Sequence, residues 1–381
     1  MASPGIAPNF AALDSDRGRA SATDGLLIAM LRASGQVSDL IFSPGRAPQV
    51  GVHGNLIPVE APGLTLLSAD DTRRLASDLI GPNKQAITML REQGSCDVSY
   101  ALPGLARFRV NIFIQRGSCA VVMRVISTTV PDFATLGLPA QLEEVADLRD
   151  GIVLITGARG SGKSSTLAAL LDCINQRQAC HIITIEDPIE FLHSHRKATI
   201  HQRELHSDTP NFAQALRAAL RQAPQVILVG EIRDRETTEM LLEAAETGHL
   251  VLSSLNTVDA AKTVERLLSV FAFGEQQGAR RRIAKTLRYV VSQRLLPRNE
   301  GGRIAAVEIL KAGPRMHEYF ERADEPRQNL LQIMKDGSSE GMQHFDGEIA
   351  RLVRDGMVDI ETAVRHATDP QELRAILQEC N

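Results

Sequence analysis

The sequence contains few of the residues that build disulfide frameworks, structural metal sites or base-stacking surfaces. It has no tryptophan and only three tyrosines, and aromatic residues make up 4% of the chain. Its five cysteines are scattered and include no Cys-x-x-Cys pair. This pattern predicts neither a zinc site nor a set of disulfides, and it fits a protein of a reducing compartment best.

Long apolar runs and an excess of one charge are also missing. No apolar stretch approaches the roughly 20 residues that a membrane-spanning helix needs, and the first residues do not show the basic and then apolar pattern of a signal peptide. We therefore expect a cytoplasmic protein. The formal net charge is −4, with acidic and basic residues interspersed. Because nucleic-acid-binding surfaces are usually basic, we expect no nucleic acid among the partners.

A phosphate-binding pattern stands near the middle of the chain. An apolar run at 152–155 precedes it and apolar residues at helical spacing follow over 167–174, so the order is strand, loop and helix. In that context a G-x-x-x-x-G-K-[ST] match predicts a loop whose backbone N–H groups surround phosphate oxygens, and a merely flexible glycine loop is the weaker interpretation. The candidate nucleotide-binding residues are Gly157, Ala158, Arg159, Gly160, Ser161, Gly162, Lys163, Ser164 and Ser165.

Nucleotide hydrolysis needs positive charge on the phosphates, a held metal ion and an oriented water. Lys163 can supply the charge, and the hydroxyl of Ser164 can ligate Mg²⁺. Carboxylates follow two apolar runs: Glu186 comes directly after the first, and Glu231 comes one residue later after the second. Because ligands of parallel sheets bind beyond the carboxyl ends of the strands, these side chains predict a site for ATP with Mg²⁺ as its cofactor.

Composition and periodicity divide the chain into four parts. Residues 1–22 are rich in small and charged residues and are expected to form a disordered tail. Residues 23–127 mix helix and strand patterns and predict a small α+β domain with an antiparallel sheet. Proline and glycine in 128–139 indicate a linker. In 140–377 apolar strands alternate with amphipathic helices, which predicts a larger α/β domain with a parallel sheet covered on both faces.

Apolar spacing and capping signals place the individual elements. At the end of the chain, Asp369 is expected to cap a helix that begins at Pro370. Asp187 and Glu190, in the acidic run that starts with Glu186, are also explained by helix N-caps. The expected helices are 26–31, one after Ser68, one from Lys163, 212–221 and 236–246, and the expected strands are 37–42, 49–53, 56–59, 96–102, 106–115, 120–127, 152–156, 181–185, 226–229 and 249–255.

Four strings occur in a characteristic order, namely GARGSGKSS, IITIEDPIEF, VILVGEIRD and AETGHL. In this order and spacing they resemble the Walker A, Asp box, Walker B and His box motifs of the secretion-type ATPase superfamily. Within it the chain resembles the PilT and PilU retraction motors of type IV pili, over nearly everything from about residue 25 to 377. The resemblance implies an α/β fold in which a RecA-like P-loop NTPase domain follows a smaller N-terminal PAS-like α+β domain.

The resemblance also implies roles for individual residues. Lys163 and Ser164 would hold the phosphates and Mg²⁺, while Glu186 and Glu231 would share water activation and metal binding. A usual Walker B strand ends in Asp-Glu, whereas here Gly230 occupies the Asp place. We therefore expect Glu186 to activate the water and Glu231 to be the metal ligand beside Ser164, and the exchanged assignment is the alternative.

Four further residues are implied to meet the nucleotide. Arg107, Arg109 and Arg124 lie on β-prone runs of the first domain, from which arginines reach the nucleotide in resembling proteins, and a solvated strand face is the alternative. His249 would sense the nucleotide, with a buried core histidine as the alternative. Asn256 takes the place of the family's second His-box histidine, and it can donate a hydrogen bond but cannot carry charge.

At the level of assembly, the resemblance implies an ATP-driven homohexamer that retracts type IV pili in twitching motility. It would lie at the cytoplasmic face of the inner membrane and act on a pilus platform protein. Asn256 and the weak match of residues 314–320 to the family's C-terminal retraction motif leave two alternatives open. One is an accessory ATPase of a pilus or secretion system. The other is a nucleotide-binding regulatory subunit with little turnover, whose partner would be a paralogous retraction ATPase.

Overall fold

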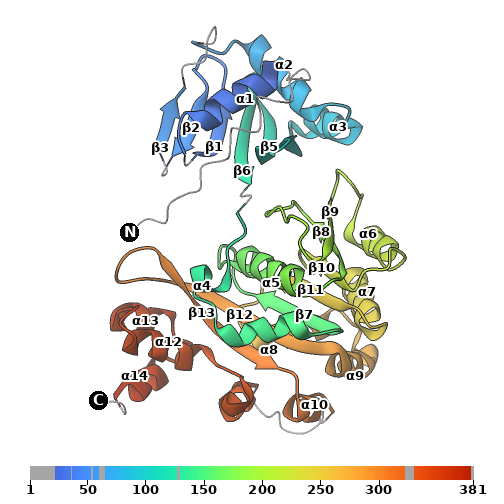
Figure 1. Cartoon of the computed structure of the whole chain (residues 1–381), viewed down its shortest axis with the longest axis vertical. Coiled ribbons are helices and arrows are strands. Elements are labelled where there is room, and N and C mark those ends of the chain that lie inside the picture. The colour runs from blue at the N-terminus through green and yellow to red at the C-terminus, as the bar shows by residue number, and fades with distance from the viewer. Residues whose placement is uncertain are drawn as a thin grey trace. The chain divides into compact units, whose positions relative to one another are not determined.

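Figure 1 shows the computed structural model, which describes residues 22–35, 37–52, 55–59, 65–126, 129–321 and 330–378. The expected tail lies outside these residues except for Ala22, where the first helix begins. The chain divides into two compact units, one of residues up to 129 with 190–192, and one of residues 130–189 with 193 onwards. The domain limits expected at 127 and 140 stay a prediction.

The first unit is built on an antiparallel sheet with the strand order β3-β2-β1-β6-β5-β4. Burial alternates along β5, where Phe108, Val110 and Ile112 are fully buried and the residues between them are not. Helices α1 and α2 contribute to the same buried cluster. The elements are α1 (Ala22–Arg32), β1 (Val37–Phe42), β2 (Gln49–Val52), β3 (Asn55–Pro58), α2 (Ala69–Ile80), α3 (Lys84–Gln93), β4 (Ser95–Leu102), β5 (Ala106–Gln115) and β6 (Ser118–Ile126).

Local signals explain which of these helices the sequence predicts. The side chain of Ser68 accepts a hydrogen bond from Asp71 N, and the Asp71 carboxylate accepts one from Ser68 N at 2.9 Å, so α2 begins with a reciprocal cap. This start was expected. Helix α3 was not expected, because Ala86 is its one buried residue and the apolar period is correspondingly weak.

The second unit contains a sheet with the order β13-β12-β7-β11-β10-β8-β9, in which all neighbours are parallel except β12 and β13. The elements are α4 (Phe133–Leu136), a 3-10 segment (Ala140–Asp147), β7 (Gly151–Thr156), α5 (Lys163–Arg177), β8 (His181–Glu186), β9 (Thr199–Glu204), α6 (Phe212–Ala219), β10 (Val226–Val229), α7 (Arg235–Glu246), β11 (Leu250–Leu255), α8 (Ala260–Ser269), α9 (Gln276–Thr286), β12 (Leu287–Pro297), β13 (Arg303–Lys311), α10 (Pro314–Glu321), α11 (Leu330–Asp336), α12 (Phe345–Arg354), α13 (Ile360–His366) and α14 (Pro370–Gln378).

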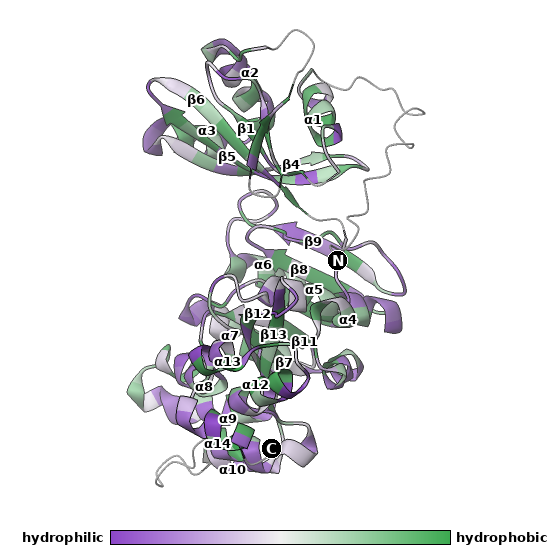
Figure 2. Cartoon of the chain, turned by 90° about the vertical axis from the view of Figure 1, so that its left-hand side faces the viewer, coloured by the Kyte–Doolittle hydropathy of each residue, from purple (hydrophilic) through white to green (hydrophobic). Residues whose placement is uncertain are grey.

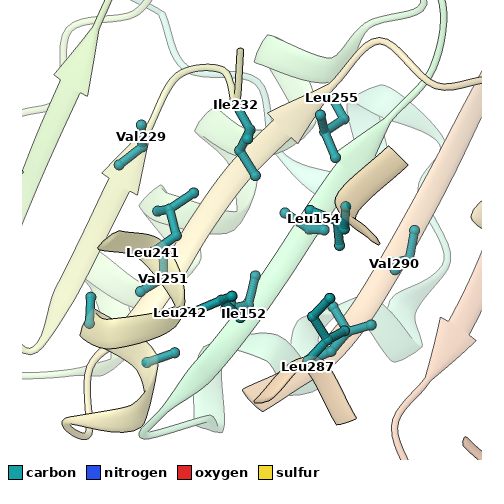
Figure 3. Close-up of a cluster of buried hydrophobic side chains, with 14 of the residues drawn as sticks. Ile152, Leu154, Val229, Ile232, Leu241, Leu242, Val251, Leu255, Leu287 and Val290 are labelled. Atoms are coloured by element: carbon teal, nitrogen blue, oxygen red, sulfur yellow. The ribbon is translucent and has the colours of Figure 1, made fainter. Parts of the chain in front are cut away.

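Both faces of this sheet are covered, as expected. Along β7, Ile152 and Leu154 join the cluster that includes Leu241 of α7, and Figure 3 shows these side chains together. The alternate residues Val153 and Ile155 join a separate cluster with the apolar side of α5. A strand buried on both sides has no polar face, which is why its sequence is an unbroken apolar run.

Three strands of this sheet were not expected. Strand β9 lies at the sheet edge, and only Ile200 and Glu204 of its residues are buried. Figure 2 shows its hydrophilic colour beside the hydrophobic β8. Strands β12 and β13 form the opposite edge, and the pattern of β12 is broken by the buried polar residues Ser292 and Gln293. Buried polar residues form hydrogen bonds with residues that are distant in the sequence, and hydrophobic periodicity cannot show such contacts.

The C-terminal helices α12, α13 and α14 share a separate small core that includes Phe345. The Asp369 carboxylate accepts hydrogen bonds from the backbone of the first turn of α14, which confirms the expected cap. The guanidinium of Arg294 on β12 lies 3.8 Å from the centroid of the Phe345 ring, so a cation–π contact joins this core to the sheet. In the described part of the chain, no helix has both the length and the apolar character needed to cross a membrane.

A buried carboxyl on β13 makes the stability of this unit depend on pH. Glu308 is 3% exposed, and its Oε1 accepts a hydrogen bond of 2.8 Å from Ala260 N at the start of α8. Burial raises the pKa of Glu308 from 4.5 to about 7. The stability due to the protonated form is therefore complete below pH 4.5 and is lost as the pH rises through about 7.

Replacing Glu308 by glutamine is expected to raise the Tm by several degrees at about pH 8.5 and to change it little at about pH 5. The amide keeps an acceptor for Ala260 N but carries no charge, so the variant avoids a loss of roughly 3 kcal/mol that the wild type suffers at high pH. Calorimetry at both pH values measures this difference. The exposed Glu265→Gln serves as the control, and an equal Tm difference at both pH values would contradict the prediction.

Candidate functional site

The carboxyl ends of four neighbouring strands lie at one end of the sheet and carry the predicted phosphate loop and both predicted carboxylates. Thr156 at the end of β7 is opposite Leu255 of β11, and Val229 of β10 is opposite Ile185 of β8. The phosphate loop (residues 157–162) follows β7, Asn256 follows β11 and Glu231 comes shortly after β10, while Glu186 is itself the last residue of β8. In the strand order β7-β11-β10-β8, the phosphate loop therefore comes first, followed by Asn256, Glu231 and Glu186.

Two glycines of the phosphate loop have no room for a side chain. Gly157 has a φ of +147°, and a Cβ there would lie 2.4 Å from Ser161 Oγ and 2.5 Å from the backbone oxygen of Gln293. Gly162 has a φ of +92°, and a Cβ there would lie 2.7 Å from Gln293 Nε2. The loop is therefore folded tightly against itself and against β12, and its shape requires glycine at both positions.

Helix α5 begins directly at the end of this loop. Lys163 is its first residue, and its Nζ donates hydrogen bonds of 2.9 Å to the carbonyl oxygens of Gly157 and Ala158. Ser164 is half-buried in the first turn, at the N-terminal end of the helix. The ammonium group, the hydroxyl and the positive end of the helix are thus brought to one place, which suits an anionic ligand.

Glu186 is the last residue of β8, and two neutral donors hold its carboxylate. Its Oε1 accepts hydrogen bonds from Thr184 Oγ1 at 2.7 Å and from Gln202 Nε2 at 3.2 Å. Thr184 lies on the same strand and Gln202 on the adjacent β9. Neither donor adds a charge, so the carboxylate is oriented without forming an ion pair to them.

Glu231 is held differently, by one cation and one amide. Arg233 Nε lies 3.3 Å from Glu231 Oε2, and Arg233 Nη1 lies 2.9 Å from Asp187 Oδ2, so one guanidinium joins the ends of β10 and β8. The amide nitrogen of Asn256 donates to Glu231 Oε1. Asp187 therefore pairs with Arg233 and caps no helix, which corrects the N-cap interpretation for this residue.

His249 lies at the end of the sheet where the parallel strands begin, and the phosphate loop lies at the other end, where they finish. It precedes β11, and its carbonyl oxygen accepts a hydrogen bond of 3.0 Å from Gly151 N at the start of β7. The loop follows the other end of β7, which is roughly 20 Å away at about 3.3 Å per residue. The Nδ1 atom of His249 lies 2.9 Å from the carbonyl oxygen of Ala244 on α7. The structure does not bring His249 together with the loop of the same chain.

The three predicted arginines belong to the first unit. Arg124 of β6 is opposite both Arg109 of β5 and Asp39 of β1 in the sheet register. Its Nε lies 2.9 Å from Asp39 Oδ1, yet its side chain is 74% exposed, while Arg107 is half-buried. Arg109 and Arg124 thus lie side by side on neighbouring strands, and each has a carboxylate within ion-pair distance, Asp97 for Arg109 and Asp39 for Arg124.

Sequence reasoning missed the residues that hold the two carboxylates. Thr184 was open to detection, because side chains two apart on a strand share one face. Gln202 was not, since β9 did not show a strand pattern. Arg233 was also missed, although it pairs with both Glu231 and Asp187 of its own chain.

Comparison with known proteins places this chain in a family. A model of the Type II/IV secretion system protein family matches residues 96–358. The type IV pilus retractation ATPase PilT of Pseudomonas aeruginosa is 40% identical over 334 residues, which are 88% of this chain and 95% of that protein. The type IV pilus ATPase PilU of the same organism is 35% identical over 354 residues, which are 93% of this chain and 90% of that protein.

A solved structure agrees with these sequence matches. The crystal structure of the pilus retraction motor PilT with bound ADP superimposes with a TM-score of 0.82 at 36% identity, and the match covers 94% of this chain and 100% of that one. This confirms the α/β fold class with a RecA-like ATPase core. The chain belongs to the Type II/IV secretion system protein family.

Proposed function

We propose that this protein is an ATP hydrolase that works as a hexameric motor and drives type IV pilus retraction. The observation that carries the proposal is that a glycine-restricted phosphate loop and two strand-end carboxylates, Glu186 and Glu231, lie at the same end of the sheet. A phosphate cradle alone would suit any nucleotide-binding protein. The carboxylates add what hydrolysis needs, namely a base for water and a ligand for the metal ion.

The loop fits the phosphates of a nucleotide on its own geometry. The space that a Cβ at Gly157 or Gly162 would need is already filled, so the backbone is fixed in a narrow turn at the start of α5. Residues 157–165 would bind the phosphates through the backbone N–H groups of the loop and of the first turn of α5. The ammonium group of Lys163 would pair with the phosphate oxygens. Arg159 is exposed on the loop and would meet the outer phosphate oxygens or solvent.

Ser164 and Glu231 are the residues that would hold Mg²⁺. Both offer oxygen atoms, which this cation prefers, and both lie at the same edge of the sheet. Bound Mg²⁺ neutralises charge on the phosphate oxygens. Glu231 is oriented for this by Arg233 and by the amide of Asn256.

Glu186 would orient the attacking water and accept its proton. Thr184 and Gln202 fix one carboxylate oxygen of Glu186 by hydrogen bonds. Glu231 is held by a different set of groups, namely the guanidinium of Arg233 and the amide of Asn256. We keep the assignment expected from the sequence, with Glu186 as the base and Glu231 as the metal ligand.

The remaining predicted residues act between subunits in this proposal. Arg107, Arg109 and Arg124 would bind phosphates from the first unit. His249 lies roughly 20 Å from the loop of its own chain along β7, so a sensing role requires a nucleotide held by a neighbouring subunit. A closed ring of six copies would provide such neighbours. The ring would act on a platform protein at the cytoplasmic face of the inner membrane.

The proposal is tested with the full-length purified chain. Mg²⁺-dependent ATP hydrolysis and a particle mass of six chains in the presence of nucleotide are expected. In the source organism, deletion of the gene should stop pilus retraction, and the wild-type gene should restore it. Absence of hydrolysis would refute the enzyme, while hydrolysis with normal retraction in the deletion strain would refute the pilus role alone.

A second function is favoured by one observation. Asn256 contacts Glu231 where the family's second histidine is expected, and an amide cannot gain or lose a proton there. A regulatory subunit with little turnover, paired with a paralogous motor, would tolerate this change. Low hydrolysis by the chain alone, together with altered hydrolysis after mixing with PilT of Pseudomonas aeruginosa, would support this second function over the first.

A further inference from the structure

A buried amide on β12 lies directly beneath the phosphate loop. Ser292 is opposite Thr156, the last residue of β7, so Gln293 reaches one residue beyond the strand that leads into the loop. The backbone oxygen of Gln293 occupies the space beside Gly157, as the 2.5 Å distance to a Cβ there shows. Strand β12 therefore supports the point at which the chain turns into the loop.

The side chain of Gln293 contacts the other end of the same loop. Its Nε2 lies 2.7 Å from the position of a Cβ on Gly162, the last loop residue before α5. Its Oε1 accepts a hydrogen bond of 2.8 Å from Thr166 Oγ1, in the first turn of α5. One residue thus contacts the beginning of the loop, the end of the loop and the helix that carries Lys163.

The chemistry of this position is unusual for its surroundings. Gln293 is 3% exposed and Thr166 is fully buried, so neither can exchange its partner for water. Burying an amide costs free energy unless it is hydrogen-bonded, and an apolar residue of similar size would fill the same space without that cost. Unlike an apolar residue, an amide at this position can form a directional hydrogen bond with the first turn of α5.

We propose that Gln293 is a positioning residue of the nucleotide site, which aligns the phosphate loop and the start of α5 for phosphate binding. This inference rests on the proposed function, because it assumes that the loop binds a nucleotide. Gln293 itself does not need to touch the nucleotide. It acts through Gly162 and Thr166. Its loss should leave the fold of the loop intact but make the orientation of the loop relative to α5 less well defined.

The test measures the dissociation constant of ADP by calorimetry with the full-length protein. Gln293→Leu keeps the volume and removes the hydrogen bond, and it is expected to raise the Kd of ADP about tenfold. Thr166→Val removes the hydroxyl from the other side and should raise the Kd to a similar extent, while Thr166→Ser should restore it. The double variant should bind about as weakly as either single variant, since both remove one interaction.

The matched control is Asn175→Leu at the other end of the same helix. Asn175 is also a fully buried amide, and it bonds to the backbone of Ser194 and Arg196, far along α5 from the loop. It should lower the Tm as Gln293→Leu does, yet leave the Kd of ADP within about twofold of wild type.

Three outcomes overturn the inference. Wild-type affinity in both Gln293→Leu and Thr166→Val would show that the bond does not align the site. An equal loss of affinity in Asn175→Leu would show a general loss of stability instead. A wild-type chain that binds neither ADP nor ATP would refute the proposed function first, which separates the two failures.

Discussion

Lys163→Ala is expected to lower kcat/KM for ATP by more than about 100-fold, which corresponds to roughly 3 kcal/mol of transition-state stabilisation. The Nζ atom of Lys163 lies over the phosphate loop, 2.9 Å from the carbonyl oxygens of Gly157 and Ala158. At this place it can exchange those neutral acceptors for phosphate oxygens. Hydrogen bonds to charged groups are the stronger ones, and negative charge on the phosphoryl group is largest during its transfer.

The measurement compares steady-state hydrolysis and ATP affinity of the variant with those of Lys262→Ala. Lys262 is an exposed lysine on α8 that pairs with Glu265, so this control removes one surface charge of the same kind. Both variants should keep the wild-type Tm and the same assembly on gel filtration. Unchanged affinity and turnover in Lys163→Ala would show that the phosphate loop does not bind ATP, and the motor hypothesis would fail with it.

The phosphate loop and the strand-end carboxylates could be predicted because their causes are local. A glycine-rich turn between an apolar strand and a helix is visible in a short stretch of sequence. The rule that parallel strands present their carboxyl ends at one end of the sheet then predicts Glu186 and Glu231 at the same end as the loop, and the register of β7, β11, β10 and β8 puts the strand ends there.

The residues that support the site could not be predicted, because their contacts join distant parts of the chain. Thr166 and Gln293 are 127 positions apart, and Asp187 and Arg233 are 46 apart. In addition, Gln293 is a polar residue in the core and interrupts the apolar pattern of β12. The sequence therefore did not predict this strand. A buried polar side chain is informative only when its partner is known.

The expectation for His249 shows how a motif can outweigh topology. A strand was expected at 249–255, which puts His249 at the start of the strand and therefore at the edge away from the loop. The family resemblance nevertheless implied a contact with the nucleotide. The structure agrees with the topological argument inside one chain, and Asn256 at the other end of β11 is the His-box residue beside Glu231.

The contrast between the two carboxylates leads to the second large effect. Glu186→Gln is expected to lower kcat by about 100-fold to 1000-fold while the affinity for Mg²⁺-ATP changes by less than about threefold. Glutamine has the same shape and can still accept the hydrogen bonds of Thr184 and Gln202. It cannot accept a proton from water, so only the chemical step should suffer.

Glu231→Gln should differ in its dependence on the metal ion. An amide oxygen is a weaker ligand for Mg²⁺ than a carboxylate, so the concentration of Mg²⁺ that gives half-maximal hydrolysis should rise about tenfold or more. The remaining Arg233 would also lose one of its two anionic partners, which adds positive charge where the cation binds. Titration of Mg²⁺ at saturating ATP measures both effects, and Glu236→Gln on α7 is the exposed control.

These two variants decide the assignment because each hypothesis predicts a different pair of results. The two roles are exchanged if Glu231→Gln abolishes turnover and leaves Mg²⁺-ATP affinity unchanged, while Glu186→Gln raises the concentration of Mg²⁺ that gives half-maximal hydrolysis. The present assignment starts from the sequence, in which Glu231 stands at the Walker B position and Glu186 supplies the second carboxylate. The contacts of the two groups also differ, since Arg233 and Asn256 hold Glu231, whereas Thr184 and Gln202 hold Glu186.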